Sequence, residues 1–419
     1  MSIRKLIILI SCLFLGGCST HNSNTVPSDI GKLKNLIVIA PQAKPAYQIS
    51  FEKDNIYGST KKRLIGSLGK FAVDDSGRVF IADIKQTTID VFNSNGRYLT
   101  HIGQKGHGPG EFRAVYPIVK GNQFVVYDVR ALRISIYSLT SLKLLKTINM
   151  TPADKNEVDA MSEAHLKRLY FINKDKYLVC FSNTIPMPSS MNDDRYHHLY
   201  LHYYFMNAHQ HIVSTELFKL KIASVLIGKV SGTMEKIVGS SLVRVRKFSF
   251  LRKPITAVTG NDHILTNESD RFLIKVYNSR GKYEHTIYYP YKNVKLTKAA
   301  AVKSIEKNAI PKNALDFREH IALQNDLPET WPALHDIEID DKSHLWVSTV
   351  VKDHSVYQWW VLTLNGKLIA RFKWPRSKPI QVIKNGYMYT TETNKETDIK
   401  KVVRYKMKME PAKNSEKPD

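Results

Sequence analysis

The sequence has little cysteine: Cys12, Cys18 and Cys180 are the only three in 419 residues. If the amino-terminal segment is removed after Gly17 and Cys18 is modified, Cys180 is the one thiol left, and this excludes an intramolecular disulfide. Cys180 stands in the apolar, strand-like run Tyr-Leu-Val-Cys-Phe. We therefore expect a buried, inert thiol there rather than a nucleophile.

The amino-terminal apolar run, residues 6–15, is too short to cross a bilayer as a permanent helix. Arg4 and Lys5 precede it, and a segment of small residues follows it. A basic start, an apolar run and small residues at the end are typical of a cleaved signal peptide. We assign residues 1–17 to that peptide.

The segment Leu15-Gly16-Gly17-Cys18 resembles the lipobox of bacterial lipoproteins. The resemblance implies acylation of the Cys18 thiol, cleavage after Gly17 and a firm lipid anchor. Residues 18–45 would then be a tether. Ser19, with no acidic residue nearby, suggests the outer membrane of a diderm cell, with the protein facing the periplasm. The alternative is an ordinary secreted protein with a cysteine near its cleavage site.

Acidic residues are scarce: 38 Asp and Glu stand against 62 Lys and Arg, which gives a net charge of +24. Such a surface attracts polyanions. An exported protein meets phospholipid head groups, lipopolysaccharide phosphates or acidic polysaccharides, so we expect an anionic glycan, a lipid head group or a protein as partner, and no nucleic acid. A generally basic, solvated surface is the alternative.

Several chemical signatures are missing from the sequence. It has no glycine-rich phosphate loop followed by lysine, no Gly-x-Ser-x-Gly elbow and no Cys/His zinc spacing, so we expect no cofactor. Histidines do gather at residues 197, 198, 202, 209 and 211. On a strand, His198 and His202 would stand roughly 13 Å apart. His209 and His211 have no evident third ligand, so we expect no metal site.

The chain repeats itself. Residues 91–102 and 276–287 agree at six of twelve positions, and each is a strand, a turn and a returning strand. Gly96 and Gly281 stand in the turns, where glycine adopts a positive φ without a Cβ clash. Four-strand units of this kind begin at Phe71 and occupy residues 117–148, 168–214, 254–288, 333–373 and, one strand short, 379–408.

A basic period near 45 residues with four strands per unit is typical of a propeller. We therefore predict an all-β fold, a six-bladed β-propeller of four-stranded blades over residues 46–409, and a monomer. The strand Tyr47–Phe51 would complete the sixth blade and close the ring.

Two insertions interrupt the period. Residues 215–253 are basic, and residues 244–250 alternate like an edge strand. Residues 291–331 form a helical insertion between late blades, with helical spacing over 296–326. The tail, residues 410–419, has no apolar periodicity and is expected to be disordered.

The glycine-rich run Ile102–Phe112 and the segment Leu327–Trp346 are similar to the blade linker and the late insertion of six-bladed β-propeller lipoproteins related to NHL-repeat proteins. This resemblance covers nearly the whole chain after residue 46. It implies the fold and export, and it carries over no catalytic residue.

Basic residues stand just before five of the six expected inner strands. If these loops ring one mouth of the central channel, they would bind a carboxylate, sulfate or phosphate. Chance proximity among so many lysines and arginines is the alternative. With a histidine of the fifth inner strand, the candidate ligand-binding residues are Lys70, Arg113, Arg168, Arg252, Lys253, His335 and Arg376.

These observations favour a binding or scaffold module over an enzyme. The alternative is a propeller lyase or hydrolase that acts at the channel mouth. A metal-dependent lactonase would need several oxygen ligands at the channel axis, and Asp336 is the one obvious acid on the expected inner strands. Tyr357, Trp359 and Trp360 could stack on sugars, although alternation favours core packing for Trp359 and Trp360. The acid–base candidates of the enzyme alternative are His101, His107, His263 and His335.

Overall fold

The computed structural model describes residues 26–60, 63–153, 164–173, 175–183, 199–222, 226–230, 242–246, 248–306 and 327–412. The predicted signal peptide and Cys18, the histidines at 197 and 198, the second half of the predicted helical segment, 307–326, and the end of the tail, 413–419, lie outside these ranges.

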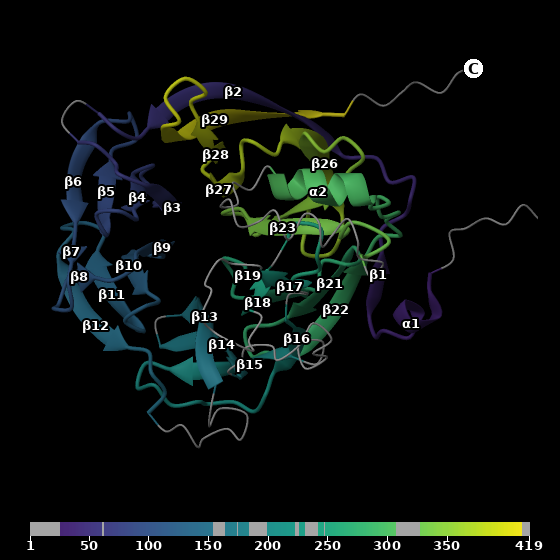
Figure 1. Ribbon diagram of the computed structural model, residues 1–419, viewed down its shortest axis with the longest axis horizontal. Coiled ribbons are helices and arrows are strands. Elements are labelled where there is room, and N and C mark those ends of the chain that lie inside the picture. Colours follow the sequence, from purple (N-terminus) through teal and green to yellow (C-terminus); the bar gives the residue numbers. More distant parts are fainter. Residues whose placement is uncertain are drawn as a thin grey trace, which may run out of the picture.

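Six antiparallel sheets surround a central axis (Figure 1). The inner strands are β3 (Leu68–Val73), β9 (Tyr116–Lys120), β13 (Ala164–Asn173), β19 (Ile255–Val258), β23 (Leu334–Ile339) and β27 (Ile380–Lys384). The second strands are β4 (Val79–Asp83), β10 (Gln123–Asp128), β14 (Lys176–Asn183), β20 (Ile264–Asn267), β24 (Leu345–Val350) and β28 (Tyr387–Thr393).

The third strands are β5 (Thr88–Phe92), β11 (Arg133–Ser138), β15 (Tyr200–Asn207), β21 (Leu273–Tyr277), β25 (Val356–Leu362) and β29 (Lys400–Pro411). The outer strands are β6 (Tyr98–Ile102), β12 (Leu144–Asn149), β16 (Phe218–Lys221), β22 (Tyr283–Tyr288), β26 (Leu368–Pro375) and β2 (Tyr47–Tyr57). The predicted all-β propeller of six blades is confirmed.

The cores lie between neighbouring blades. Every residue of β4 and β5 is buried, because both faces of these middle strands are covered by protein. Phe80 of the first blade stacks on Phe124 of the second with ring centroids 4.4 Å apart. Phe272 of the fourth blade meets Trp360 of the fifth edge-on at 5.5 Å. Apolar side chains on both faces of each sheet thus hold adjacent blades together.

A buried aspartate at the end of the second strand fastens two loops in each of the first two blades. We call this arrangement the aspartate clamp. Asp83 accepts hydrogen bonds from the backbone N–H groups of residues 66, 67, 85 and 86. Asp128 accepts them from residues 113, 114, 130 and 131. Each clamp therefore fixes the loop before its inner strand and the loop after its second strand.

The ring is closed by strands far apart in the sequence. β2 pairs antiparallel with β29, from Tyr47 opposite Pro411 to Tyr57 opposite Val402. The predicted closing strand is confirmed and runs six residues further than expected. The disordered tail predicted from residue 410 is wrong for its first two residues, because Glu410 and Pro411 pair with β2. Phe51 of β2 packs against Phe372 at 4.8 Å, so β2 also joins the sixth blade to the fifth. Closure leaves fewer strand edges open to other chains.

The third blade differs from its prediction. Its outer strand is β16, whereas the predicted unit ended at residue 214. After the turn fixed by the Asn207 side chain, Ile212 forms an isolated bridge with Met206 rather than part of a regular strand. The chain returns to regular pairing only at Phe218.

Two short elements precede β2. α1 (Ser28–Gly31) lies beside the fourth blade, and β1 (Leu36–Val38) pairs in parallel with β22 as a fifth strand of that blade. The predicted tether over residues 18–45 thus includes a part that pairs with the propeller.

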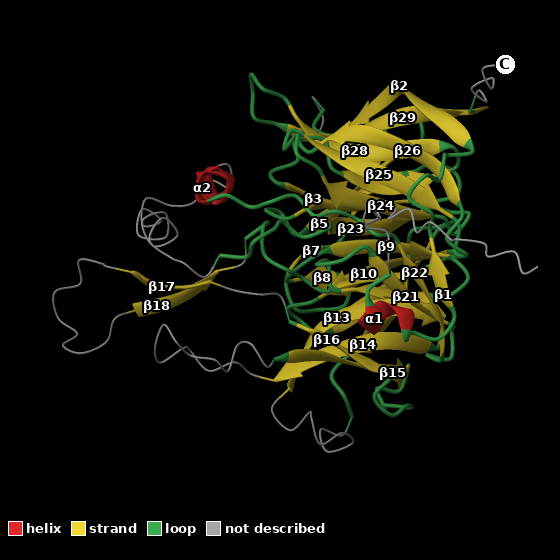
Figure 2. Ribbon diagram, turned by 90° about the vertical axis from the view of Figure 1, so that its right-hand side faces the viewer, coloured by secondary structure: helices red, strands yellow, loops and turns green. Residues whose placement is uncertain are grey.

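Both insertions lie on one side of the disc (Figure 2). β17 (Leu226–Val230) and β18 (Leu242–Arg246) form a hairpin. The helical insertion predicted over residues 291–331 is confirmed only as one short helix, α2 (Lys298–Glu306), in the described part of that segment. The predicted edge strand over 244–250 ends at Arg246, because Phe248 and Phe250 are buried beside Trp331. Within the described ranges, no helix has both the length and the apolar character needed to cross a bilayer.

Candidate functional site

Four of the predicted ligand residues come together around one acid at the mouth of the central channel. Lys253 precedes β19, Lys70 belongs to β3, His335 and Asp336 open β23, and Arg376 precedes β27. The Nζ of Lys253 lies 3.9 Å from the Oδ2 of Asp336. β23 contacts both β19 and β27, and β27 contacts β3, so four blades contribute to this site.

His335, Tyr357 and Arg376 form a stack. The His335 and Tyr357 rings lie almost parallel, with centroids 4.2 Å apart, and the Arg376 guanidinium carbon lies 4.2 Å from the Tyr357 centroid. Arg376 Nε donates a hydrogen bond to the carbonyl of Val356 at 3.0 Å. Its Nη2 is buried and has no hydrogen-bond partner among the described residues. The guanidinium is thus held in place while one donor stays unused.

Next to this stack lies a cavity of about 100 Å³. Two of its lining residues have buried polar atoms without a partner in the described part of the chain: Trp359 Nε1 and Gln381 Oε1. Gln381 is oriented by a 2.7 Å hydrogen bond from its Nε2 to Thr391 Oγ1. A buried donor and a buried acceptor on residues that line a small cavity are suited to bind water or a small ligand there. The lining residues include Lys70, His335, Asp336, Glu338, Tyr357, Trp359, Trp374, Lys378 and Gln381.

The site changes the ionisation of two side chains of β23 in opposite directions. Burial, and then the neighbouring Asp336, raise the pKa of Glu338 to about 8 against the opposing effect of Lys70 and Lys253. Burial and then Lys253 lower the pKa of His335 to about 4. At neutral pH both groups are therefore mostly uncharged.

The cations outnumber the ionised acids here. Lys378 binds Glu392 at 3.1 Å and donates to the Tyr405 hydroxyl, while Lys253 faces Asp336. With Glu338 protonated, Lys70 and Arg376 have no carboxylate ion-pair partner in the described ranges. The site is electropositive and can accept an anion.

The remaining predicted residues lie elsewhere. Arg168 donates to the Tyr170 hydroxyl at 3.4 Å. Arg252 donates to the carbonyl of Ile222 and lies 3.7 Å from Glu268. Arg113 lines a separate depression on the second blade. The positive charge at the channel mouth thus gathers around the fourth to sixth and first blades.

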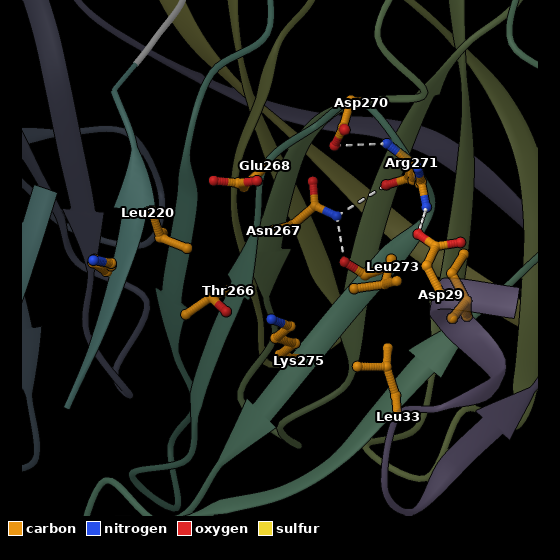
Figure 3. A pocket seen from close by; sticks show the side chains of 12 residues that line it. Asp29, Leu33, Leu220, Thr266, Asn267, Glu268, Asp270, Arg271, Leu273 and Lys275 are labelled. Carbon is orange, nitrogen blue, oxygen red and sulfur yellow. Dashed lines mark hydrogen bonds and ion pairs between the residues drawn. The ribbon is translucent and has the colours of Figure 1, made fainter. Parts of the chain in front are cut away.

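A groove of about 360 Å³ between the third and fourth blades is drawn in Figure 3. Arg271 pairs with Asp29 of α1 across one end, and the Asn267 side chain donates to the backbone carbonyls of Arg271 and Leu273. Burial raises the pKa of Asp270, and Glu268 adds to this effect. Because Arg271, Asp29 and Asn267 are engaged in these contacts, we place the candidate site at the channel mouth.

Other predictions concern histidines and aromatic residues. His101 contacts the Tyr98 hydroxyl on an outer strand and His263 lies 3.4 Å from Glu284, so His335 is the acid–base candidate that lines the channel cavity. The described residues include no group of three or more His, Cys, Asp or Glu suited to a metal. Trp359 and Trp360 are only 4% and 2% exposed, which confirms their core packing.

Cys180 is fully buried, as predicted, and burial raises the pKa of its thiol to about 12. Glu338 was missed from the sequence, although it stands two residues after Asp336 on the same strand. That spacing places both side chains on one face, and this was the available signal.

A comparison with proteins of curated function found no match. A solved member of the DUF4221 family from Bacteroides vulgatus is 12% identical with a TM-score of 0.50, over 88% of this chain and all of that one. A Bacteroides fragilis protein described as exported is 12% identical with a TM-score of 0.46, over 89% and 99% of the two chains. The family profile described as a 6-bladed beta-propeller matches residues 58–294, more than half of the sequence. The chain therefore belongs to this family of six-bladed β-propellers.

Proposed function

We propose that the protein is an exported lipoprotein whose propeller binds an anionic ligand at the channel mouth and acts as a binding module. One observation carries the ligand proposal: Arg376 is fixed over Tyr357 while its buried Nη2 has no partner in the described structure. A buried, unsatisfied guanidinium donor costs stability unless a ligand or water binds it. Lys70 lines the neighbouring small cavity together with His335 and Tyr357 of the stack.

The site suits a small carboxylate. The unpaired Nη2 of Arg376 can donate a charge-assisted hydrogen bond to a carboxylate, and protonated Glu338, which lines the cavity, supplies a neutral donor. The cavity has room for the acidic end of a glycan rather than for a whole sugar chain. We therefore favour acidic glycans as partners; a lipid head group or a protein carboxylate would present the same chemistry.

Membrane attachment rests on the sequence. Arg4 and Lys5, the apolar run and Leu15-Gly16-Gly17-Cys18 support cleavage after Gly17 and acylation of Cys18. The proposed place is the outer membrane, with the propeller facing the periplasm.

The ligand proposal is tested by thermal shift with glucuronate and acetate at constant ionic strength. We expect both carboxylates to raise the midpoint of the wild type and to leave Arg376→Gln unaffected. Arg280→Gln, an exposed arginine of a turn, removes the same charge elsewhere and should respond like the wild type. An equal response of the wild type and Arg376→Gln would contradict the proposal.

The opposite pKa shifts of His335 and Glu338 favour a second candidate, acid–base catalysis on an acidic polysaccharide. A neutral imidazole can accept a proton and a protonated carboxyl can donate one at the same pH. New reducing ends from a polyuronate, lost in both His335→Asn and Glu338→Gln, would support this candidate. Binding without any product would favour the binding module.

A further inference from the structure

The second blade carries a depression of about 570 Å³ that is lined by basic side chains. His107, Arg113, Arg130 and Arg133 line it together with Ala131, Thr147 and Asn149. No carboxylate belongs to this lining, and none forms an ion pair with the three arginines in the part of the chain that is described. Three like charges that line one depression repel one another, so their arrangement needs an explanation.

The aspartate clamp of the second blade positions two of these arginines. Asp128 is fully buried and binds the backbone N–H of Arg113 at 2.7 Å and that of Arg130 at 3.1 Å. The two arginines come from different loops, one before β9 and one after β10. The clamp holds both backbones at one place, and the two side chains line the same depression.

The third arginine is fixed by the linker between the first two blades. Arg133 donates from Nη1 to the carbonyl of His107 at 2.7 Å and from Nη2 to the carbonyl of Glu111. The Glu111 carboxylate in turn accepts from the Gly108 N–H at 2.8 Å and from the Gln104 amide. Arg133 and His107 are therefore held in place before any ligand arrives.

The first blade shows that the fold does not require arginines here. Its clamp, Asp83, binds the same two kinds of loop, but these loops present Gly66, Ser67, Lys85 and Gln86. The loops bound by the aspartate clamp thus contain no arginine at the clamped positions of the first blade and two arginines at those of the second. Loop geometry alone does not account for the charge of the second blade.

We propose that this depression binds the phosphate group of a phosphorylated ligand. A phosphate monoester carries up to two negative charges and three terminal oxygens, which match several arginine forks better than the single charge of a carboxylate does. The volume admits a phosphorylated sugar. Sugar phosphates and lipid head groups share this chemistry. The site lies on another blade than the channel residues and does not depend on the proposed function.

The test uses the soluble chain from residue 19 onward and measures binding of glucose 6-phosphate by calorimetry, at constant ionic strength. We expect the double variant Arg113→Gln/Arg130→Gln to bind about tenfold or more weakly than the wild type. Arg133 is left in place because it holds the linker. Arg97→Gln, which changes an exposed arginine of the first blade, should bind like the wild type.

Vesicles distinguish the two sources of phosphate. Retention on phosphatidate vesicles but not on phosphatidylcholine vesicles, lost in the double variant, identifies a lipid head group. Binding of the sugar phosphate alone identifies a phosphorylated glycan. Equal affinity of the wild type and the double variant for both probes, or equal weakening in Arg97→Gln, overturns the proposal. Unchanged urea midpoints check that the variants are folded.

Discussion

Two side chains of β23 show how one environment acts oppositely on an acid and a base. Burial disfavours whichever form is charged, so it raises the pKa of Glu338 and lowers that of His335. Their shared neighbours, Lys253 and Asp336, modify both shifts without reversing them. Such paired shifts are concentrated at functional sites, and they make the stability of the protein depend on pH.

Glu338→Gln should remove part of this pH dependence. The pKa of Glu338 is raised in the folded state, so the unfolded chain releases its proton first, and wild-type stability falls as pH rises from about 4.5 to about 8. Glutamine has no proton to release. We expect the variant to equal the wild type near pH 4 and to exceed it by on the order of 2 kcal/mol near pH 8.5, by urea denaturation.

The matched control is Glu396→Gln, which neutralises an exposed acid in a loop. Its difference from the wild type should stay within about 0.5 kcal/mol at both pH values. A Glu338→Gln difference that does not change with pH would show that this carboxyl is ionised throughout the range.

A second prediction concerns the contribution of the Asp128 side chain to stability. Asp128→Ala leaves four backbone N–H groups of two loops without their acceptor, and we expect a loss of about 3 kcal/mol in the free energy of unfolding. Asp175→Ala, at an exposed position, should cost less than about 0.5 kcal/mol. Equal urea midpoints for the two variants would mean that water replaces the clamp at no cost.

The basic candidate residues could be predicted from the sequence because they stand next to the inner strands. The sequence did not show which of them lie together at the channel mouth. Lys253 meets Asp336 because β19 and β23 are neighbours, whereas Arg252, one residue earlier, turns to Glu268 and the end of the third blade. Adjacent residues of an extended chain point to opposite sides. Which side faces the channel depends on blade twist and bulges, such as the register shift between Leu334 and Asp336.

At the level of secondary-structure elements, the repeats could be identified from the sequence where apolar and polar residues alternate along the strands and a glycine turn separates two strands. The first and fourth blades have such turns at Gly96 and Gly281, with φ of 80° and 75°. In the third blade, Gln210 takes the left-handed conformation instead, and the outer strand begins several residues later than predicted. The pairing of β1 with β22 left no sequence signal, since it involves three residues distant along the chain.

Truncations separate the contributions of the two amino-terminal strands. A chain starting at Ala46 loses α1 and β1 but keeps β2, and should still unfold cooperatively and remain monomeric. A chain starting at Gly58 also loses β2, which exposes the edge of β29 and uncovers the Phe372 and Trp374 rings. We expect this second chain to aggregate, as measured by size-exclusion chromatography. Equal behaviour of the two chains would contradict the closing role of β2.

At the scale of the whole molecule, the proposed lipid anchor determines where the disc works. Cys18→Ser removes the acceptor thiol, so we expect the exported protein to move from the membrane fraction to the soluble fraction and to lose incorporation of labelled palmitate. Cys180→Ser, which changes the buried thiol, should stay in the membrane fraction. Labelling that persists in Cys18→Ser would rule out this anchor.

The sixth blade is built from β2 near the start of the chain and β29 near its end. During synthesis, β2 cannot pair until almost the entire polypeptide has been made, because its partner β29 lies near the end of the chain. A prematurely terminated product leaves β2 without β29 and the apolar side of the fifth blade uncovered, which a protease can recognise. We therefore expect only full-length chains, in which β2 and β29 pair, to resist proteolysis.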